Sequence, residues 1–223
     1  MIGVGAPGTQ GTSTSQNLFI GNGSFAATGG TAVGYNSYAG VNSVAVGTNA
    51  YANGPLDTAL GYGSSVGADH GTAVGANTSI NPNATYATAL GYGASVGANG
   101  TNSVAIGANS VANQPNTVSF GSPGAERRLT NVAAGIYNTD AANLGQVREA
   151  YAGVAMAFAM TAVQPSLNKG EMAVSLGVGD YLGQSAFSLR YEAQPIDNIF
   201  IGGALGYSTN GDLGGSAGVG FKW

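Results

Sequence analysis

The sequence has no cysteine, a single histidine and very few charged side chains. Only 7% of its 223 residues are charged, against about 25% in an average soluble domain. Without cysteine, the chain can form no disulfide framework, no cysteine-based zinc site and no cysteine nucleophile. Its 6 basic residues against 10 acidic ones exclude the basic surface that binds nucleic acid, so we expect no nucleic-acid partner.

The few charges are distributed unevenly. Residues 1–125 contain no Lys, Arg or Glu, and Asp57 and Asp69 are their only acidic residues. Met1 is followed by neither a basic segment nor an apolar run, so we expect that a signal peptide was removed or that the sequence is an excised fragment. The longest uncharged apolar stretch, residues 150–163, is shorter than the ~20 residues of a lipid-spanning helix.

Glycine, in contrast, is abundant, with 39 residues, and it marks a repeat. A tetrapeptide ending in Gly recurs from Leu18–Gly21 to Val118–Gly121 at steps of 13 to 16 residues. The residue before Gly is always large and apolar, while the preceding Ala must point the other way, into a space for little more than a methyl group. We predict that these large residues form the core of the repeat: Val33, Val46, Leu60, Val74, Leu90, Ile106 and Phe120.

A second short strand is expected in each repeat. Ala39, Ala52 and Val66, for example, stand five residues after a repeat Gly, and Asn, Gly and Pro residues supply the turns between strands. Two strands and two turns in about 14 residues describe one coil of a parallel β-roll. A single coil cannot bury its apolar face, so we expect the coils to stack.

Groups that could carry chemistry are scarce in this region. Gly61-Tyr62-Gly63 and Gly91-Tyr92-Gly93 resemble phosphate-binding loops, but no helical pattern follows either of them, so we expect no nucleotide site. His70, beside Asp69, is expected in a turn without further metal ligands. No paired carboxylates and no triad are visible. We therefore expect no catalytic residue, no metal site and no cofactor.

A helical pattern follows the repeats. Thr139 or Asp140 is expected to cap the helix, and Pro165 to end it. Val147 to Gln164 would extend about 27 Å, close to the apolar band of about 25 Å in an outer-membrane barrel. The other faces carry Ala and Gly. Apolar residues at steps of three and four predict a coiled-coil seam: Leu144, Val147, Tyr151, Val154 and Phe158.

Four segments with alternating side chains end the sequence, at about residues 172–179, 186–191, 199–207 and 216–223. One face of each is large and apolar and the other is small or polar, which is typical of transmembrane β-barrel strands. A half-buried soluble meander is the alternative, but its core would face only Gly and Ala. The small residues predicted to line the pore are Gly177, Gly179, Gly202, Gly206, Gly218 and Gly220.

Four strands cannot close a barrel, and lipid does not tolerate an open sheet edge. Two copies would give eight strands, whose interior is filled by its own side chains. Three copies give twelve strands and a lumen wide enough for three helices. We therefore predict a homotrimer in which the seams pack helix to helix and the small helix faces meet the small strand faces.

From about residue 15 to 223, the chain resembles the trimeric autotransporter adhesins of Gram-negative bacteria. The repeats resemble the family's head, most closely at Asn42–Gly47 and Asn102–Gly107. Arg128–Gly135 followed by Thr139–Asn143 resembles the neck, and Lys169–Trp223 resembles the membrane anchor, which ends in an aromatic residue. One departure is the near absence of a coiled-coil stalk between neck and anchor, so the head would sit close to the membrane.

The resemblance implies a mostly β fold with one helix. Its parts would be a homotrimeric left-handed parallel β-roll head (1–123), a neck (124–146), a coiled-coil or pore helix (147–165) and an anchor (166–223). The anchor would be a 12-stranded transmembrane β-barrel with 4 strands per chain and three helices in its lumen. The neck residues would be Arg127, Arg128, Asn131, Asp140 and Asn143, and the aromatic residues used in membrane assembly would be Phe221 and Trp223.

In function, the resemblance implies adhesion without catalysis. The anchor would contact outer-membrane lipid, be inserted by the barrel-assembly machinery and export its own head. The head would bind extracellular matrix, host surfaces or other bacteria through an unidentified ligand. An alternative stays open, in which the chain is mainly an export and anchoring unit whose head is a stable cap without a specific ligand.

Overall fold

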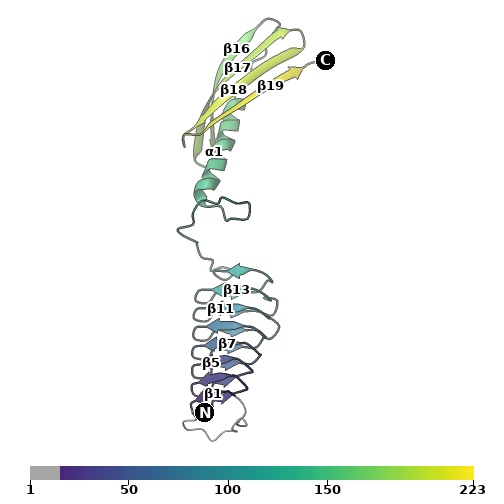
Figure 1. The fold of residues 1–223 in the computed structure, drawn as a ribbon. Coiled ribbons are helices and arrows are strands. Elements are labelled where there is room, and N and C mark those ends of the chain that lie inside the picture. Colours follow the sequence, from purple (N-terminus) through teal and green to yellow (C-terminus); the bar gives the residue numbers. More distant parts are fainter. Residues whose placement is uncertain (1–15) are drawn as a thin grey trace. The chain divides into compact units, whose positions relative to one another are not determined.

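A computed structural model describes residues 16–223 of the chain (Figure 1). The chain divides into two compact units, with the division after Arg128. Two expectations, the start of the head within 1–123 and the missing leader signal after Met1, fall on residues 1–15 and lie outside the described residues. No helix within residues 16–223 is long and apolar enough to cross a membrane.

The first unit is a solenoid of two parallel sheets. The repeat tetrapeptides form an eight-stranded sheet: β1 (Leu18–Ile20), β3 (Thr31–Val33), β5 (Val44–Val46), β7 (Thr58–Leu60), β9 (Thr72–Val74), β11 (Thr88–Leu90), β13 (Val104–Ile106) and β15 (Val118–Ser119). The second strands form a seven-stranded sheet: β2 (Phe25–Ala26), β4 (Tyr38–Ala39), β6 (Tyr51–Ala52), β8 (Ser65–Val66), β10 (Ser79–Ile80), β12 (Ser95–Val96) and β14 (Val111–Ala112). The predicted two-strand coil is confirmed.

Small residues fill the solenoid. The middle residue of each tetrapeptide, such as Ala59 or Ala89, is fully buried and faces residues such as Val66 and Ile80 of the other sheet. The prediction for the flanking large residues is wrong for the single chain, because they lie on the outer face of the eight-stranded sheet. Leu60, for example, remains 42% exposed. Since side chains alternate along a strand, burying the central Ala turns its neighbours outward. The residues concerned are Val33, Val46, Leu60, Val74, Leu90, Ile106 and Phe120.

The turn after each tetrapeptide explains the repeat Gly. At Gly61 the backbone has φ +133°, and a Cβ there would lie 2.5 Å from the carbonyl oxygen of Gly75 in the next coil. Two residues on, Gly63 has φ +61°, and neighbouring coils place Asn49 and Asn77 at φ +57° and +55°. The first position thus needs glycine, whereas the second is a left-handed position that Asn also occupies.

The second unit contains one helix, α1 (Leu144–Thr161), and an antiparallel sheet. Its strands are β16 (Met172–Tyr181), β17 (Gln184–Ile196), β18 (Ile199–Ser208) and β19 (Leu213–Phe221), paired in that order. Figure 1 shows α1 against one face of this sheet, and the helix contacts β16, β17 and β18. Within the described chain, β16 and β19 are the sheet's two edges.

The ends of α1 differ from expectation. Asn143, rather than Thr139 or Asp140, caps the helix, because Asn143 and Gln146 exchange side-chain hydrogen bonds with each other's backbone N–H. Asp140 instead closes a turn by accepting from the N–H groups of Ile136 (2.9 Å) and Tyr137 (3.0 Å). The helix also ends at Thr161 rather than Gln164.

Candidate functional site

The β16–β19 sheet has two chemically different faces. Its outer face is apolar and exposed: Val174, Leu176 and Val178 of β16 are 65–76% exposed. The alternating residues Gly177 and Gly179 are buried on the inner face, as are Ala186, Ala204 and Gly206 of the neighbouring strands. This division matches the alternation predicted for membrane strands.

The inner face meets the small-residue face of α1. A Cβ placed at Gly177 would collide with the carbonyl oxygen of Ala159, and one at Gly179 would collide with that of Ala155. Both glycines therefore allow the helix backbone to touch the sheet. A Cβ at Gly206 would lie 2.7 Å from Cε of Met160, so a third predicted glycine also faces the helix.

The remaining predicted pore glycines have no helix beside them. Within the described chain, a Cβ at Gly218 would meet no atom within 4 Å, and one at Gly220 would meet only Cβ of Phe200, at 3.8 Å. Gly202 lies against the neighbouring strand instead. A hollow of about 380 Å³ lies over this part of the sheet. Arg190 and Glu192 form an ion pair in its wall.

The seam residues lie mostly away from the sheet. Leu144 and Phe158 are 63% and 50% exposed. Val154 is exposed, and Val147 and Tyr151 are partly buried. The rings of Tyr151 and Phe158 touch Tyr181 edge to face, at centroid distances of 5.5 and 5.9 Å. The helix thus exposes a stripe of apolar side chains that Tyr181 covers only in part. At the C-terminus, Phe221 and Trp223 are exposed.

The predicted neck residues fall in different environments. Arg127 fastens the last coil, donating from Nη1 to Ser110 Oγ and to the carbonyl of Phe120, each at 2.7 Å. Asn143 holds the helix start by donating to the carbonyl of Val132 at 3.2 Å. Arg128 and Asn131 are exposed. Arg127 belongs to the first compact unit, and Asp140 and Asn143 belong to the second.

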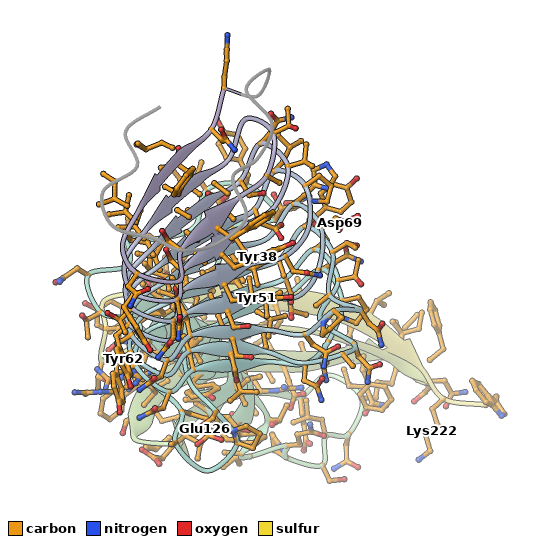
Figure 2. The ribbon with its side chains drawn as sticks, turned by 90° about the horizontal axis from the view of Figure 1, so that it is seen from below. Tyr38, Tyr51, Tyr62, Asp69, Glu126 and Lys222 are labelled. Carbon is orange, nitrogen blue, oxygen red and sulfur yellow. The ribbon has the colours of Figure 1, made fainter. Side chains whose placement is uncertain are left out.

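The solenoid has two uncharged faces of different composition. The eight-stranded sheet exposes aliphatic side chains such as Val44, Leu60 and Leu90. The seven-stranded sheet carries a ladder of Phe25, Tyr38 and Tyr51, whose rings stack with centroids 5.1 Å apart at each step. Figure 2 labels Tyr38 and Tyr51 of this ladder. Either face could support contacts with a partner.

His70 lies in a turn, as predicted, and its ring stacks on Tyr86 at 4.8 Å. The Gly61 and Gly91 loops lead into the short strands β8 and β12 rather than helices, so they lack the arrangement that binds phosphate. Among residues 16–223, no three His, Asp or Glu side chains are grouped as metal ligands would be.

Asp57 has a structural role that the sequence did not reveal. It is 1% exposed, and its carboxylate accepts from the N–H groups of Gly54 (2.7 Å) and Gly71 (2.9 Å). Its own N–H donates to Ser43 Oγ at 3.0 Å, so it ties together three consecutive coils. The repeat alignment contains an indication of this role, because Asp57 occupies the coil position where the neighbouring repeats have the small residues Ser43 and Gly71.

Burial raises the pKa of Asp57 above its ordinary 3.8, against the opposing effect of the two N–H donors and with a smaller contribution from Asp69. Because the folded-state pKa is the higher one, ionisation of Asp57 opposes folding, and stability returns as pH falls through the raised pKa. Between pH 7 and about 4, the wild-type solenoid should gain thermal stability relative to Asp57→Asn. Melting curves of the full chain at several pH values measure this. Parallel curves for the two proteins would contradict it.

Taken by itself, the second unit has the features of an outer-membrane anchor: an apolar outer face, a glycine-lined inner face and a helix against it. The first unit is a repeat head. Comparison with known families agrees. The YadA-like membrane anchor domain matches residues 163–223, and the YadA head domain repeat matches residues 26–50, 39–64, 52–78 and 98–122. The chain belongs to the trimeric autotransporter adhesins, with an outer-membrane anchor and a surface-exposed head.

Two individual proteins illustrate the likeness. The autotransporter adhesin NhhA of Neisseria meningitidis serogroup B is 28% identical over 112 residues, covering 43% of this chain. The chain spans only 19% of that relative's length. The solved collagen-binding domain of the Yersinia adhesin YadA is 28% identical, with a TM-score of 0.45 over 61% of this chain and 75% of that one.

Proposed function

We propose that the chain acts as a homotrimeric adhesin that exports its own head, anchors it in the outer membrane and attaches the cell to host matrix, host cells or other bacteria. The observation that carries this proposal is the incomplete anchor. One chain supplies a sheet with two edges and an inner face that its own helix covers only in part.

Three chains would pair the free sheet edges and cover the rest of the inner face. Joining β19 of one copy to β16 of the next closes twelve strands and leaves no edge in lipid. The helices of the other two copies would fill the hollow beside Gly218 and Gly220, and the exposed seam residues Leu144 and Phe158 would pack helix to helix. In this arrangement residues 147–165 would contain the pore helix and residues 166–223 would form the barrel.

The head fits the same symmetry. Its eight-stranded sheet exposes Leu60 and Leu90 in one row, in register with Val74 between them, and an apolar row of this kind is stabilised when it faces another copy. The large repeat residues would then form the core of the trimer rather than of the single chain. The seven-stranded sheet, on the other side of the solenoid, would remain free for ligand.

The outer face would meet outer-membrane lipid. The exposed Phe221 and Trp223 would be the C-terminal aromatics that the barrel-assembly machinery uses when it inserts the anchor. Residues 124–146 would be the neck, which joins the head to the helix and includes the helix's first residues from Leu144 on.

Adhesion should depend on the head and be nearly insensitive to salt. Residues 1–125 carry only two charged side chains, so binding comes from many uncharged contacts repeated along three heads. Cells displaying the full chain should adhere equally well, within about twofold, in ~0.05 and ~0.5 M salt. A variant lacking residues 16–121 should be displayed without adhering.

The same assay separates the two functional readings. Adhesion that disappears with the head supports the adhesin. A displayed full chain that attaches no better than the headless variant would favour the export and anchoring unit. Steep loss of binding with salt would contradict the uncharged contact surface.

A further inference from the structure

A second column of tyrosines follows one edge of the solenoid. Tyr35, Tyr62 and Tyr92 each stand directly after a repeat Gly, and the hexapeptide Thr-Ala-Leu-Gly-Tyr-Gly occurs identically at 58–63 and 88–93. Small residues take this position in the coils between them: Thr48 and Ala76. Figure 2 shows Tyr62 at an edge away from Asp69. The tyrosines therefore recur on every second coil.

Backbone hydrogen bonds fix this register. The N–H of Gly63 donates to the carbonyl of Thr48 at 2.9 Å, that of Asn77 to Tyr62 at 2.8 Å, and that of Gly93 to Ala76 at 2.9 Å. Each coil is thus one rung of a continuous ladder. With rungs about 4.8 Å apart, successive tyrosines are separated by about 9.6 Å.

This spacing distinguishes the column from the Phe25–Tyr38–Tyr51 ladder. In that ladder the rings stack on each other at 5.1 Å, so they cover one another's faces. Tyr35, Tyr62 and Tyr92 are 53%, 58% and 59% exposed, and none has an aromatic stacking partner among residues 16–223. If the tyrosine rings lie parallel across it, a gap of about 9.6 Å accepts one flat ring at about 4.8 Å from each tyrosine, which is an ordinary stacking distance.

The floor of each gap is small and polar. Ala76 lies between Tyr62 and Tyr92, and the exposed Asn77 follows it in a left-handed backbone position with φ +55°. A Cβ at Gly63 would lie 2.9 Å from Oδ1 of Asn77, so the amide reaches over the coil of Tyr62. Thr48 and Asn49 occupy the same two positions in the gap between Tyr35 and Tyr62.

We propose that these gaps bind the sugar rings of a neutral glycan. The inference rests on the proposed adhesive function and names its ligand class. A pyranose ring has an apolar C–H face, which suits a tyrosine ring, and a rim of hydroxyl groups, which suits an asparagine amide. Residues 1–125 contain no Lys or Arg, so sulfated or sialylated glycans would find no cation to pair with. Repetition along each head and over three heads multiplies a weak single contact.

Cells displaying the full chain test this on surfaces coated with neutral gluco-, manno- and galacto-oligosaccharides, with the sulfated forms of the same sugars, and with matrix protein. Tyr62→Ala should weaken attachment to one of the neutral sugars about tenfold or more. Ala76→Tyr should weaken it as strongly, because the added ring fills the gap although it enlarges the aromatic surface. The neighbouring coils already place Tyr at this position, so the variant keeps a compatible backbone.

Two matched variants serve as controls. Tyr62→Phe keeps the stacking ring and should retain most of the binding. Tyr86→Ala removes an equally exposed tyrosine (60%) that lies outside the column and should bind normally. Display and heat resistance of the trimer, measured for every variant, identify any that fail to fold.

The inference is overturned if no neutral sugar is bound, if Ala76→Tyr binds sugar better than wild type, or if the tyrosine variants lose attachment to protein instead. Head-dependent attachment to matrix protein without sugar binding would overturn the inference and leave the proposed adhesin intact. Equal attachment by the full chain and the headless variant would remove the adhesin as well.

Discussion

Gly177→Asn is expected to produce a trimer that dissociates at much lower temperature and displays less head at the cell surface. Gly177 lies on the inner face of β16, directly against the carbonyl of Ala159 in α1. Any side chain there must push the helix away from the sheet, because the obstacle is helix backbone rather than a flexible side chain. Overpacking of this kind costs about 1–3 kcal/mol per site, and threefold symmetry would repeat it in every chain.

Val178→Leu is the matched control. Val178 adjoins Gly177 in sequence but lies on the outer face, 65% exposed, so a larger apolar side chain there should change little. Heat dissociation of the trimer in detergent and surface labelling of the head measure both variants. Equal stability and equal display of the two would contradict the assignment of strand faces and the helix-in-barrel arrangement built on it.

Gly61→Ala should unfold several coils of the head. Its φ of +133° is a conformation that residues with a Cβ rarely adopt, and the Cβ would lie 2.6 Å from the carbonyl carbon of Gly75. Backbone strain and overpacking of this kind cost about 1–3 kcal/mol each, so the total is roughly 2–6 kcal/mol per chain. Hydrogen exchange of the full chain should show faster exchange in the neighbouring coils, with the anchor unaffected.

Gly63→Asn provides the contrast two residues away. Gly63 has φ +61°, and Asn49 and Asn77 occupy the same coil position with nearly the same φ. The Cβ at Gly63 would meet only the amide oxygen of Asn77, which can move. The variant should therefore keep wild-type exchange. If both substitutions were tolerated, the close approach of successive repeat glycines would not be what holds the coils together.

The sequence predicted the coil and the anchor strands well, because both follow from local periodicity. The Ala at the centre of each tetrapeptide was expected in a methyl-sized space, and Ala59 and Ala89 are fully buried there. The alternation in residues 172–179 likewise separated Val178 from Gly177 and Gly179. A period of two decides which side chains share a face.

Periodicity does not decide which face is buried within one chain. The prediction places Leu60 and Leu90 in the core of the repeat, but Ala59 and Ala89 take the inward position of these strands, so the large residues on either side lie outside. The predicted helix cap, Thr139 or Asp140, is wrong because a cap depends on two residues rather than one. Asn143 caps the helix because Gln146, three residues further on, completes a reciprocal pair of hydrogen bonds. This pair outweighs the capping preference of a single residue.

Other features depend on long-range contacts. Asp57 is buried by coils on either side of it, and its partners Gly54 and Gly71 are turn residues whose N–H groups only the folded solenoid directs at the carboxylate. Met156 and Met160, which fill the space beside Gly206, lie on the helix face opposite the predicted seam, where the spacing of apolar residues predicts no contact. Both follow from packing between segments that are distant in sequence.

The most direct test of the account is the oligomeric mass of the full chain purified from outer membranes in detergent. An open four-stranded sheet with a partly covered inner face has free edges that lipid does not tolerate, and in the proposed trimer twelve strands with three helices would close the barrel. Native mass spectrometry should therefore give the mass of three chains, with no stable smaller species before heating. A folded monomer or dimer would contradict the proposed architecture.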